Sequence, residues 1–192
     1  MRIISGKSRG TRLASVGKGD AAAHLRPTSD RVRESIFNLL MGGAYGDPIT
    51  DARVLDLFAG TGALGLEALS RGAAHATFVD DGRKALSLIR QNIDLTRCDE
   101  FTRVMSQNAT RLRACKTEPF DLVFLDPPYG KALGEKALAV AASSAWLRPG
   151  ALVVWEENAA QSAPDGFVLL DQRRYGDTSV SIMRLGGLQD VN

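Results

Sequence analysis

The chain has 192 residues, of which 44% are hydrophobic and 24% are charged, a balance typical of one soluble domain with a substantial core. No apolar run approaches the ~20 residues that span a bilayer, and basic residues among the first twelve interrupt any signal-peptide pattern. The two cysteines lack metal-ligand spacing. We therefore expect a cytoplasmic protein without a membrane segment or bound metal, and a monomer as its simplest state.

The net charge of +2 is unevenly distributed along the chain. Residues 1–40 contain eight basic and three acidic side chains, a net charge of +5, which leaves −3 for the remainder. A basic arm on a mildly acidic body suggests a polyanionic partner, although a solvated tail would give the same pattern. The basic residues that we single out are Arg2, Lys7, Arg9, Arg12, Arg26, Arg31 and Arg33.

Residues 1–47 are expected to form a small N-terminal extension ahead of the main domain, residues 48–192. Residues 2–5 and 11–14 flank a glycine-containing turn, which predicts a small β-hairpin. The glycine- and alanine-rich segment 16–23 is expected to be mobile.

A helix should follow this segment, with Thr28 or Ser29 as its N-cap and an apolar face that includes Val32 and Ile36. Arg26, Arg31 and Arg33 lie near its start, where cations oppose the helix dipole, and this placement hints at an anionic ligand.

From residue 53 the pattern changes to strands that alternate with helices, which predicts βαβ units and a mostly parallel sheet with helices on both faces. The last two strands are separated only by a short Gly176-Asp177 break and should form an antiparallel hairpin. The predicted strands are 53–58, 75–80, 101–105, 120–126, 149–156, 167–173 and 178–185. The predicted helices are 63–71, 82–96, 107–114 and 131–145.

A glycine-rich turn follows the first of these strands and matches the GxGxxG pattern through Gly60, Gly62 and Gly65. Asp80 ends the next strand, at the spacing expected for a carboxylate that binds ribose hydroxyls. These features fit a nicotinamide dinucleotide and S-adenosylmethionine equally well. Asp56, inside the strand, favours S-adenosylmethionine, because an ionised carboxylate would repel a pyrophosphate but attract an ammonium and a sulfonium.

The stretch Asp126-Pro127-Pro128-Tyr129 ends the fourth strand of the predicted sheet. Asp126 and the Pro127 carbonyl offer two hydrogen-bond acceptors beside the flat ring of Tyr129. Such a site suits a planar group that carries an NH2, for example a nucleobase with an exocyclic amine. Because ligands in open α/β sheets bind beyond the strand ends at the switch point, we expect this stretch to lie beside the glycine loop.

Asn108 and Ala109 follow the third strand and are placed to contact the adenine edge of a nucleoside cofactor. A helix N-cap is an equally good interpretation of Asn108.

These segments resemble the class I S-adenosylmethionine-dependent methyltransferases that modify amino groups, through residues 55–69, Phe78–Asp80 and Asp126–Tyr129. Residues 1–6, 26–28 and 30–38 make the chain similar to the RsmD family, bacterial enzymes that methylate N2 of a guanine in 16S ribosomal RNA. The resemblance implies a Rossmann-like fold and S-adenosylmethionine held by Asp56, Gly60, Gly62, Asp80, Asn108 and Ala109. It further implies catalysis by Asp126, Pro127 and Tyr129, and a basic arm that contacts 16S RNA in an assembling small subunit. Asn108 replaces an aspartate that many class I enzymes carry there.

Other functions remain open at this point. An oxidoreductase could use the same glycine loop, but the function would leave Asp126-Pro127-Pro128-Tyr129 without a role. A non-catalytic RNA-binding module would have no need to keep Asp126. Methylation of adenine N6 in DNA, or of a glutamine side chain, is closer, because those families carry similar sequences at the fourth strand. The N-terminal resemblance and the basic arm favour ribosomal RNA.

Overall fold

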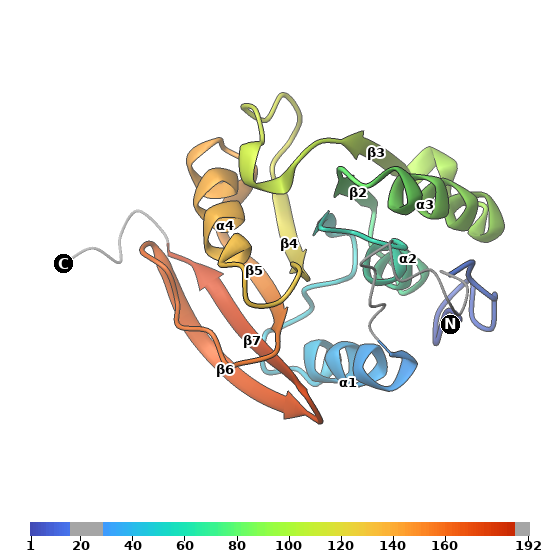
Figure 1. The fold of residues 1–192 in the computed structure, drawn as a ribbon. Coiled ribbons are helices and arrows are strands. Elements are labelled where there is room, and N and C mark those ends of the chain that lie inside the picture. The colour runs from blue at the N-terminus through green and yellow to red at the C-terminus, as the bar shows by residue number, and fades with distance from the viewer. Residues whose placement is uncertain (16–28, 187–192) are drawn as a thin grey trace.

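A computed structural model describes residues 1–15 and 29–186 of the chain. These residues form a seven-stranded sheet in the order β3-β2-β1-β4-β5-β7-β6, flanked by helices (Figure 1). The strands are β1 Arg53–Leu57, β2 His75–Asp80, β3 Thr102–Ser106, β4 Phe120–Leu125, β5 Leu147–Glu157, β6 Phe167–Tyr175 and β7 Thr178–Leu185. The helices are α1 Asp30–Met41, α2 Ala63–Ser70, α3 Arg83–Thr96 and α4 Leu133–Ser143.

The first five strands pair in parallel, and β7 pairs antiparallel with both β5 and β6. The predicted fold class, a mostly parallel sheet that ends in an antiparallel hairpin, is therefore confirmed. The strand order reverses between β1 and β4, which lie side by side: β2 and β3 extend the sheet beyond β1, and β5, β7 and β6 extend it beyond β4. This is the switch point, where the carboxyl ends of parallel strands leave room for a ligand.

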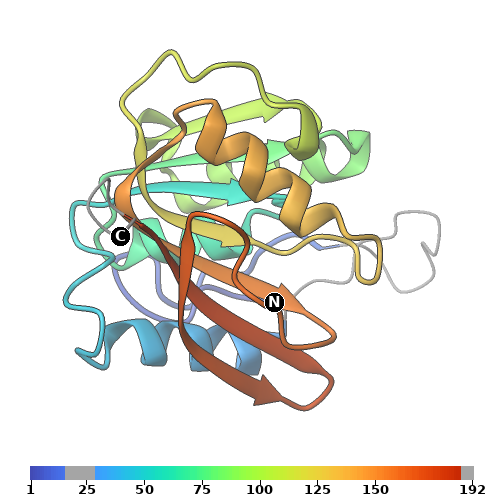
Figure 2. The ribbon, with the colours of Figure 1, turned by 90° about the vertical axis from the view of Figure 1, so that its left-hand side faces the viewer.

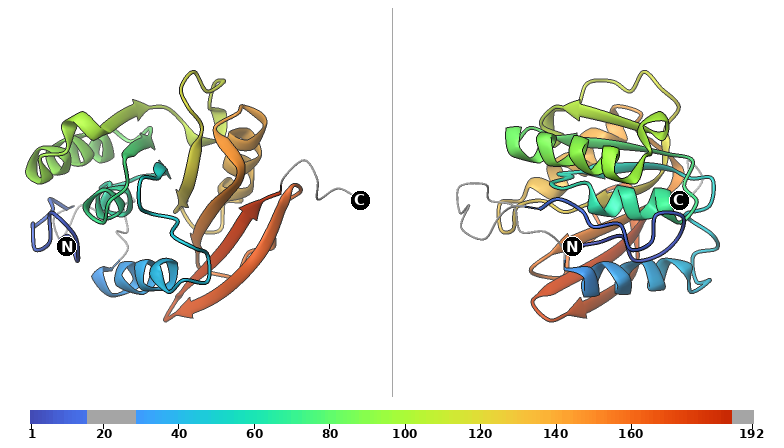
Figure 3. Two further views of the ribbon diagram at one scale, coloured as in Figure 1. Left: turned by 180° about the vertical axis from the view of Figure 1, so that it is seen from behind. Right: turned by 90° about the vertical axis from the view of Figure 1, so that its right-hand side faces the viewer.

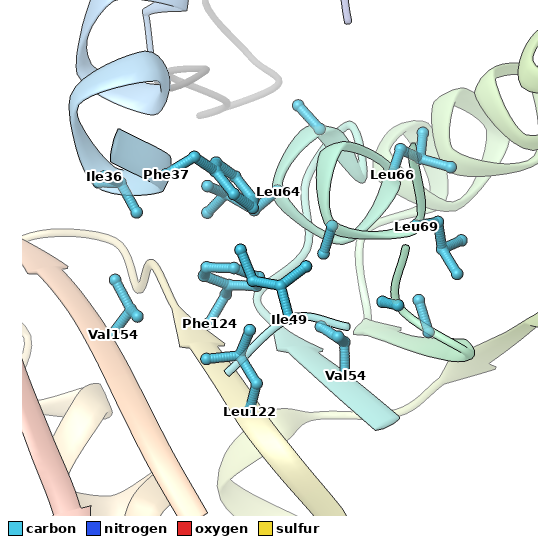
Figure 4. Close-up of a cluster of buried hydrophobic side chains, with 14 of the residues drawn as sticks. Ile36, Phe37, Ile49, Val54, Leu64, Leu66, Leu69, Leu122, Phe124 and Val154 are labelled. Atoms are coloured by element: carbon cyan, nitrogen blue, oxygen red, sulfur yellow. The ribbon is translucent and has the colours of Figure 1, made fainter. Parts of the chain in front are cut away.

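Two hydrophobic clusters cover the two faces of the sheet. The side chains of α1, α2 and α3 pack on one face against Val54, Leu122 and Phe124 (Figure 4). The side chains of α4 pack on the other face with Leu55 and Val123. The central strands are thus buried on both faces, which explains why they consist of nearly continuous apolar residues instead of an alternating pattern.

The N-terminal arm, residues 1–15, lies against α2 and beside α1 (Figure 3). Ile3 and Leu13 are buried in the same cluster as Ile36 and Phe37 of α1, so this arm is part of the core of the protein. The expected hairpin is present as a short antiparallel pairing: Arg2 pairs with Arg12, and the Ile3 and Leu13 N–H groups donate to the Thr11 and Met1 carbonyls at 2.9 and 3.1 Å. The prediction that residues 16–23 are mobile lies outside the described residues.

The predicted helix over residues 107–114 is wrong. A short 3-10 turn at Ala109–Arg111 takes its place, and the chain then runs without regular structure to β4. Only Ala109 and Leu112 are buried in this segment, so a longer helix would have no apolar face to pack.

Ser29 caps α1, because its side chain accepts a hydrogen bond from the Val32 N–H. Among the described residues, none of the helices has the length and apolar character needed to cross a membrane. Within residues 1–15 and 29–186 there is also no cluster of three or more His, Cys, Asp or Glu side chains suited to a metal ion.

Candidate cofactor and substrate site

The glycine loop begins directly after β1 and turns the chain into α2. The Ala59 N–H donates to the Val79 carbonyl at 3.1 Å, which fixes the loop to the end of β2. Gly62 has a φ of 76° and precedes the first residue of α2. This left-handed conformation favours glycine, because a Cβ there would strain the turn. The loop therefore presents backbone N–H groups at the start of a helix, as a nucleotide site requires.

Asp56 is buried beneath this loop, with 2% of its surface exposed. Its Oδ2 accepts a hydrogen bond of 3.0 Å from the Gly65 N–H, in the first turn of α2. Burial raises the pKa of Asp56 to about 8, an effect that the hydrogen bond from Gly65 opposes. A largely protonated carboxyl group does not repel a pyrophosphate at neutral pH, so the charge argument from the sequence loses its basis. Asp56 positions the loop, and a direct contact with a cofactor stays a prediction.

Gly65 allows α2 to approach the sheet closely. A Cβ at this position would lie 2.5 Å from Cε1 of Phe78, on β2, and 3.2 Å from Oδ2 of Asp56. The third glycine of the pattern therefore serves helix-to-strand packing.

Asp80 ends β2 and lies beside the glycine loop. Its Oδ2 accepts from the Gly60 N–H at 2.9 Å, and its Oδ1 accepts from the Gly82 N–H at 2.8 Å. The side chain is half-buried, and burial raises its pKa although both hydrogen bonds lower it. A carboxylate oxygen can accept more than one hydrogen bond, so each retains capacity for a hydroxyl group.

Asn108 caps the turn that follows β3. Its Oδ1 accepts from the Thr110 N–H at 2.9 Å, and its Nδ2 donates to Asp81 Oδ2 at 2.8 Å. The N-cap interpretation of Asn108 is confirmed. Ala109 is buried beside it, and the adenine contact of both residues stays a prediction.

The end of β4 meets the glycine loop across the switch point. The Asp126 N–H donates to the Leu57 carbonyl, the last residue of β1, at 3.4 Å. Pro127 is buried, whereas Asp126 and Tyr129 are half-buried and Pro128 is exposed. The glycine loop and Asp126–Tyr129 are therefore neighbours, as their places in the sequence predicted.

Tyr129 is anchored by a residue that the sequence analysis missed. Its hydroxyl donates to Glu156 Oε1 at 3.2 Å, and Glu156 is 4% exposed near the end of β5. Burial is the main cause that raises the pKa of Tyr129 to about 12, and the nearby Glu156 and Asp126 charges add to it. The sequence could have indicated Glu156, because it lies near the carboxyl end of a predicted strand that is parallel to β4 and next to it.

The basic residues of the N-terminal extension fall into two groups. Five of them are exposed: Arg2, Lys7, Arg9, Arg12 and Arg31. Arg33 differs, because its side chain is completely buried and lies 2.9 Å from Asp30 and 3.8 Å from Glu67. The prediction that Arg33 contacts RNA is therefore corrected: the residue holds the arm and α1 together. Arg26 lies outside the described residues.

Glu67, on α2, is the buried anchor of the N-terminal arm. Its two oxygens accept from the Ile4 and Ser5 N–H groups at 2.8 and 3.0 Å. Arg71 lies 2.7 Å away and, with Arg33, supplies compensating positive charge. Sequence reasoning missed this cluster, since Glu67 is far in the chain from Ile4, Ser5 and Arg33.

Asn92, fully buried on α3, links the arm to the glycine loop. Its side chain makes two hydrogen bonds with the backbone of Ala14, at 2.7 and 3.1 Å. Its Nδ2 also donates to the Thr61 carbonyl, between the two loop glycines, at 2.9 Å. The arm and the candidate cofactor loop therefore share one buried hydrogen-bond network.

Comparison with known proteins shows the family to which this chain belongs. Residues 1–184 match the family model described as "Conserved hypothetical protein 95". The chain belongs to this family. It is 36% identical to the ribosomal RNA small subunit methyltransferase D of Haemophilus influenzae over 93% of this chain and 91% of that protein. The protein of the same name from Escherichia coli is 38% identical over 85% and 78% of the two chains.

Solved structures agree with these sequence matches. The structure of yhhF from Escherichia coli has a TM-score of 0.81, 35% identity, and covers 97% of this chain and 98% of that chain. An RNA methyltransferase from Salinibacter ruber, solved in complex with S-adenosyl-L-homocysteine, has a TM-score of 0.66 over 87% and 98% of the chains. At 14% identity, that second likeness concerns the fold alone. The resemblance to the RsmD family is thereby confirmed.

Proposed function

We propose that this protein transfers a methyl group from S-adenosylmethionine to the N2 amine of a guanine in 16S ribosomal RNA. Relatives named ribosomal RNA small subunit methyltransferase D, at 36% and 38% identity, support the enzyme class and the RNA. The observation that carries the proposal is the hydrogen bond from Asp126 to Leu57. This backbone bond brings Asp126 next to the end of β1, shortly before the glycine loop, as a transfer between the two sites would require.

The glycine loop and Asp80 fit S-adenosylmethionine. Asp80 would hold the ribose hydroxyls through acceptor capacity that its two backbone hydrogen bonds leave unused. Gly60 and Gly62 would let the cofactor lie close to the backbone, and Asn108 with Ala109 would border the adenine. When bound, S-adenosylmethionine supplies a methyl group that is already activated by its sulfonium.

The residues after β4 would orient the guanine. Asp126 and the Pro127 carbonyl accept hydrogen bonds from the N2 hydrogens, which turns the nitrogen lone pair toward the methyl carbon. Tyr129 stacks on the base, which has left its own stack in the RNA. Asp126, or water beside it, would take the proton that the amine releases when it receives the methyl group. Most of the rate enhancement then comes from positioning.

The exposed arginines and lysine of the arm would contact phosphates, which fix the register of the RNA without selecting a sequence. Adenine N6 or glutamine methylation would use the same Asp126 geometry, so the geometry alone does not choose among these amines. The N-terminal arm and the relatives named ribosomal RNA small subunit methyltransferase D favour ribosomal RNA.

Transfer of labelled methyl groups tests the proposal. Unmethylated small-subunit particles, naked 16S RNA and duplex DNA are each incubated with the protein and labelled S-adenosylmethionine, and nuclease digestion identifies the modified base. We expect N2-methylguanine in the particles or in their RNA. Methyladenine in DNA would overturn the substrate, and binding of NAD without any methyl transfer would overturn the enzyme class.

A further inference from the structure

A cavity of about 360 Å3 lies between the N-terminal arm and the first turn of α1. Three arginines line it, Arg2 and Arg9 from the arm and Arg31 from α1, together with Asp30 and Glu34. Its volume falls within the range of about 300–1,000 Å3 that is typical of small-molecule sites. Nothing in the glycine loop or in residues 126–129 contributes to its lining, so it is separate from the methyl-transfer site.

Only some of the charged groups of this cavity are paired within the protein. Asp30 Oδ1 accepts from Arg33 Nη2 at 2.9 Å and from the Arg2 N–H at 3.4 Å, so its charge is compensated from within the protein. Within the described residues, the guanidinium groups of Arg2, Arg9 and Arg31 have no carboxylate within 4.0 Å. The cavity therefore presents three cations and one further carboxylate, Glu34, to a ligand.

The frame of the cavity is rigidly built. Arg33, completely buried, donates to the Arg2 carbonyl and to Asp30, which fixes the arm to the start of α1. The Ile4 N–H, next along the arm, is held by Glu67 at 2.8 Å. The lining positions are thus fixed before a ligand binds, which lowers the entropic cost of binding.

The cavity is close to the candidate cofactor loop. Met1 Sδ lies 3.8 Å from Oγ1 of Thr61, which stands between Gly60 and Gly62. Figure 2 shows the start of the chain and α1 on the same side of the sheet. The arm that lines the cavity therefore also contacts the candidate cofactor loop.

We propose that this cavity binds one ribonucleotide of the RNA substrate, next to the methylated guanine. Its phosphate contacts Arg2, Arg9 and Arg31, and the Glu34 carboxylate accepts a hydrogen bond from its ribose 2′-hydroxyl. A lone phosphate would be repelled by Glu34, whereas a ribose hydroxyl satisfies a carboxylate and distinguishes RNA from DNA. The proposal deepens the proposed function and rests on it.

The first test measures the affinity of unmethylated 16S RNA in the absence of S-adenosylmethionine, so that it can be interpreted even if methyl transfer fails. We expect Arg9→Ala with Arg31→Ala to weaken binding at least about tenfold, the loss expected for charge-assisted hydrogen bonds. The slope of log affinity against log salt should become shallower by up to about one, because both arginines contact the same phosphate. The affinity for S-adenosylmethionine and the melting temperature should not change.

Arg184→Ala is the matched control. Arg184 is exposed and pairs in register with Leu152, which is aligned with Leu122 near the amino ends of the parallel strands. It is thus far along the sheet from the cofactor loop, and its loss should leave RNA affinity unchanged. Equal losses in the control and the double variant, or no loss in either, would overturn the site.

The second test asks whether one substitution weakens or strengthens the binding of RNA and DNA. Glu34→Gln removes a negative charge from the cavity and keeps an acceptor atom. If the ribose 2′-hydroxyl contacts Glu34, the substitution should weaken RNA binding several-fold and leave binding of DNA of the same sequence unchanged or tighter. Tighter binding of both nucleic acids would refute the ribose contact, because it is the result expected of a site for phosphate alone.

Discussion

The buried carboxyl group of Asp56 makes the stability of this protein depend on pH in a direction opposite to that of most acidic residues. Its pKa is about 8 in the folded protein, against 3.8 for the ordinary side chain. Between these two pH values the unfolded chain has released the proton and the folded chain keeps it, so stability falls as pH rises. The slope is about 1.4 kcal/mol per pH unit, which gives about 3–4 kcal/mol between pH 5 and pH 8.

Asp56→Asn removes this titration and keeps an acceptor for the Gly65 N–H. Urea unfolding of both proteins, without cofactor and at several pH values, gives the free energy of unfolding. The difference between them isolates the contribution of Asp56, because other titrating groups are common to both. We expect the free energy of unfolding of the variant, relative to that of the wild type, to increase as pH rises from 5 to 8. Parallel pH profiles would show that Asp56 is ionised in the folded protein and refute the reasoning.

Four further substitutions, at three positions, test the site and its support. Asp126→Ala should leave the affinity for S-adenosylmethionine nearly unchanged and lower methyl transfer a hundredfold or more; equal losses in both quantities would contradict its role on the substrate. Tyr129→Phe removes the bond to Glu156 and should retain most activity, whereas Tyr129→Ala should not, if stacking by the ring dominates; steady-state rates of the two variants decide. Glu67→Ala removes one of the two carboxylates beside the buried Arg33 and the acceptors of the Ile4 and Ser5 N–H groups, and should cost about 3–5 kcal/mol in urea unfolding.

Local sequence patterns were sufficient to predict the sheet and its switch point. The central parallel strands β1 and β4 are apolar runs followed by turns, and the glycine loop and residues 126–129 carry recognisable residue types for a cofactor and an amine. The helix expected at residues 107–114 failed, because helix propensity there has no apolar face to support it. Arg33 was misjudged because the burial of a charged side chain depends on partners distant in sequence, here Glu67. The burial of Asp56, which removes the charge argument for its role, was likewise not visible in the local pattern.

The N-terminal arm shows why deletion is a poor test of RNA binding in this protein. Ile3 and Leu13 are buried in the core, and removal of residues 1–15 would also leave Glu67 and Asn92 without the backbone groups that they bind. Each unsatisfied buried polar group costs about 1–3 kcal/mol. Since Asn92 also holds the Thr61 carbonyl, the loss should reach the cofactor loop.

We therefore expect deletion of residues 1–15 to lower both the melting temperature and the affinity for S-adenosylmethionine, measured by scanning and titration calorimetry. Arginine substitutions on the exposed surface of the arm should lower RNA affinity alone. If the deletion weakened RNA binding without any change in melting temperature or cofactor affinity, the arm would be a separable tether, and the buried network that joins it to α2 and α3 would have no energetic importance.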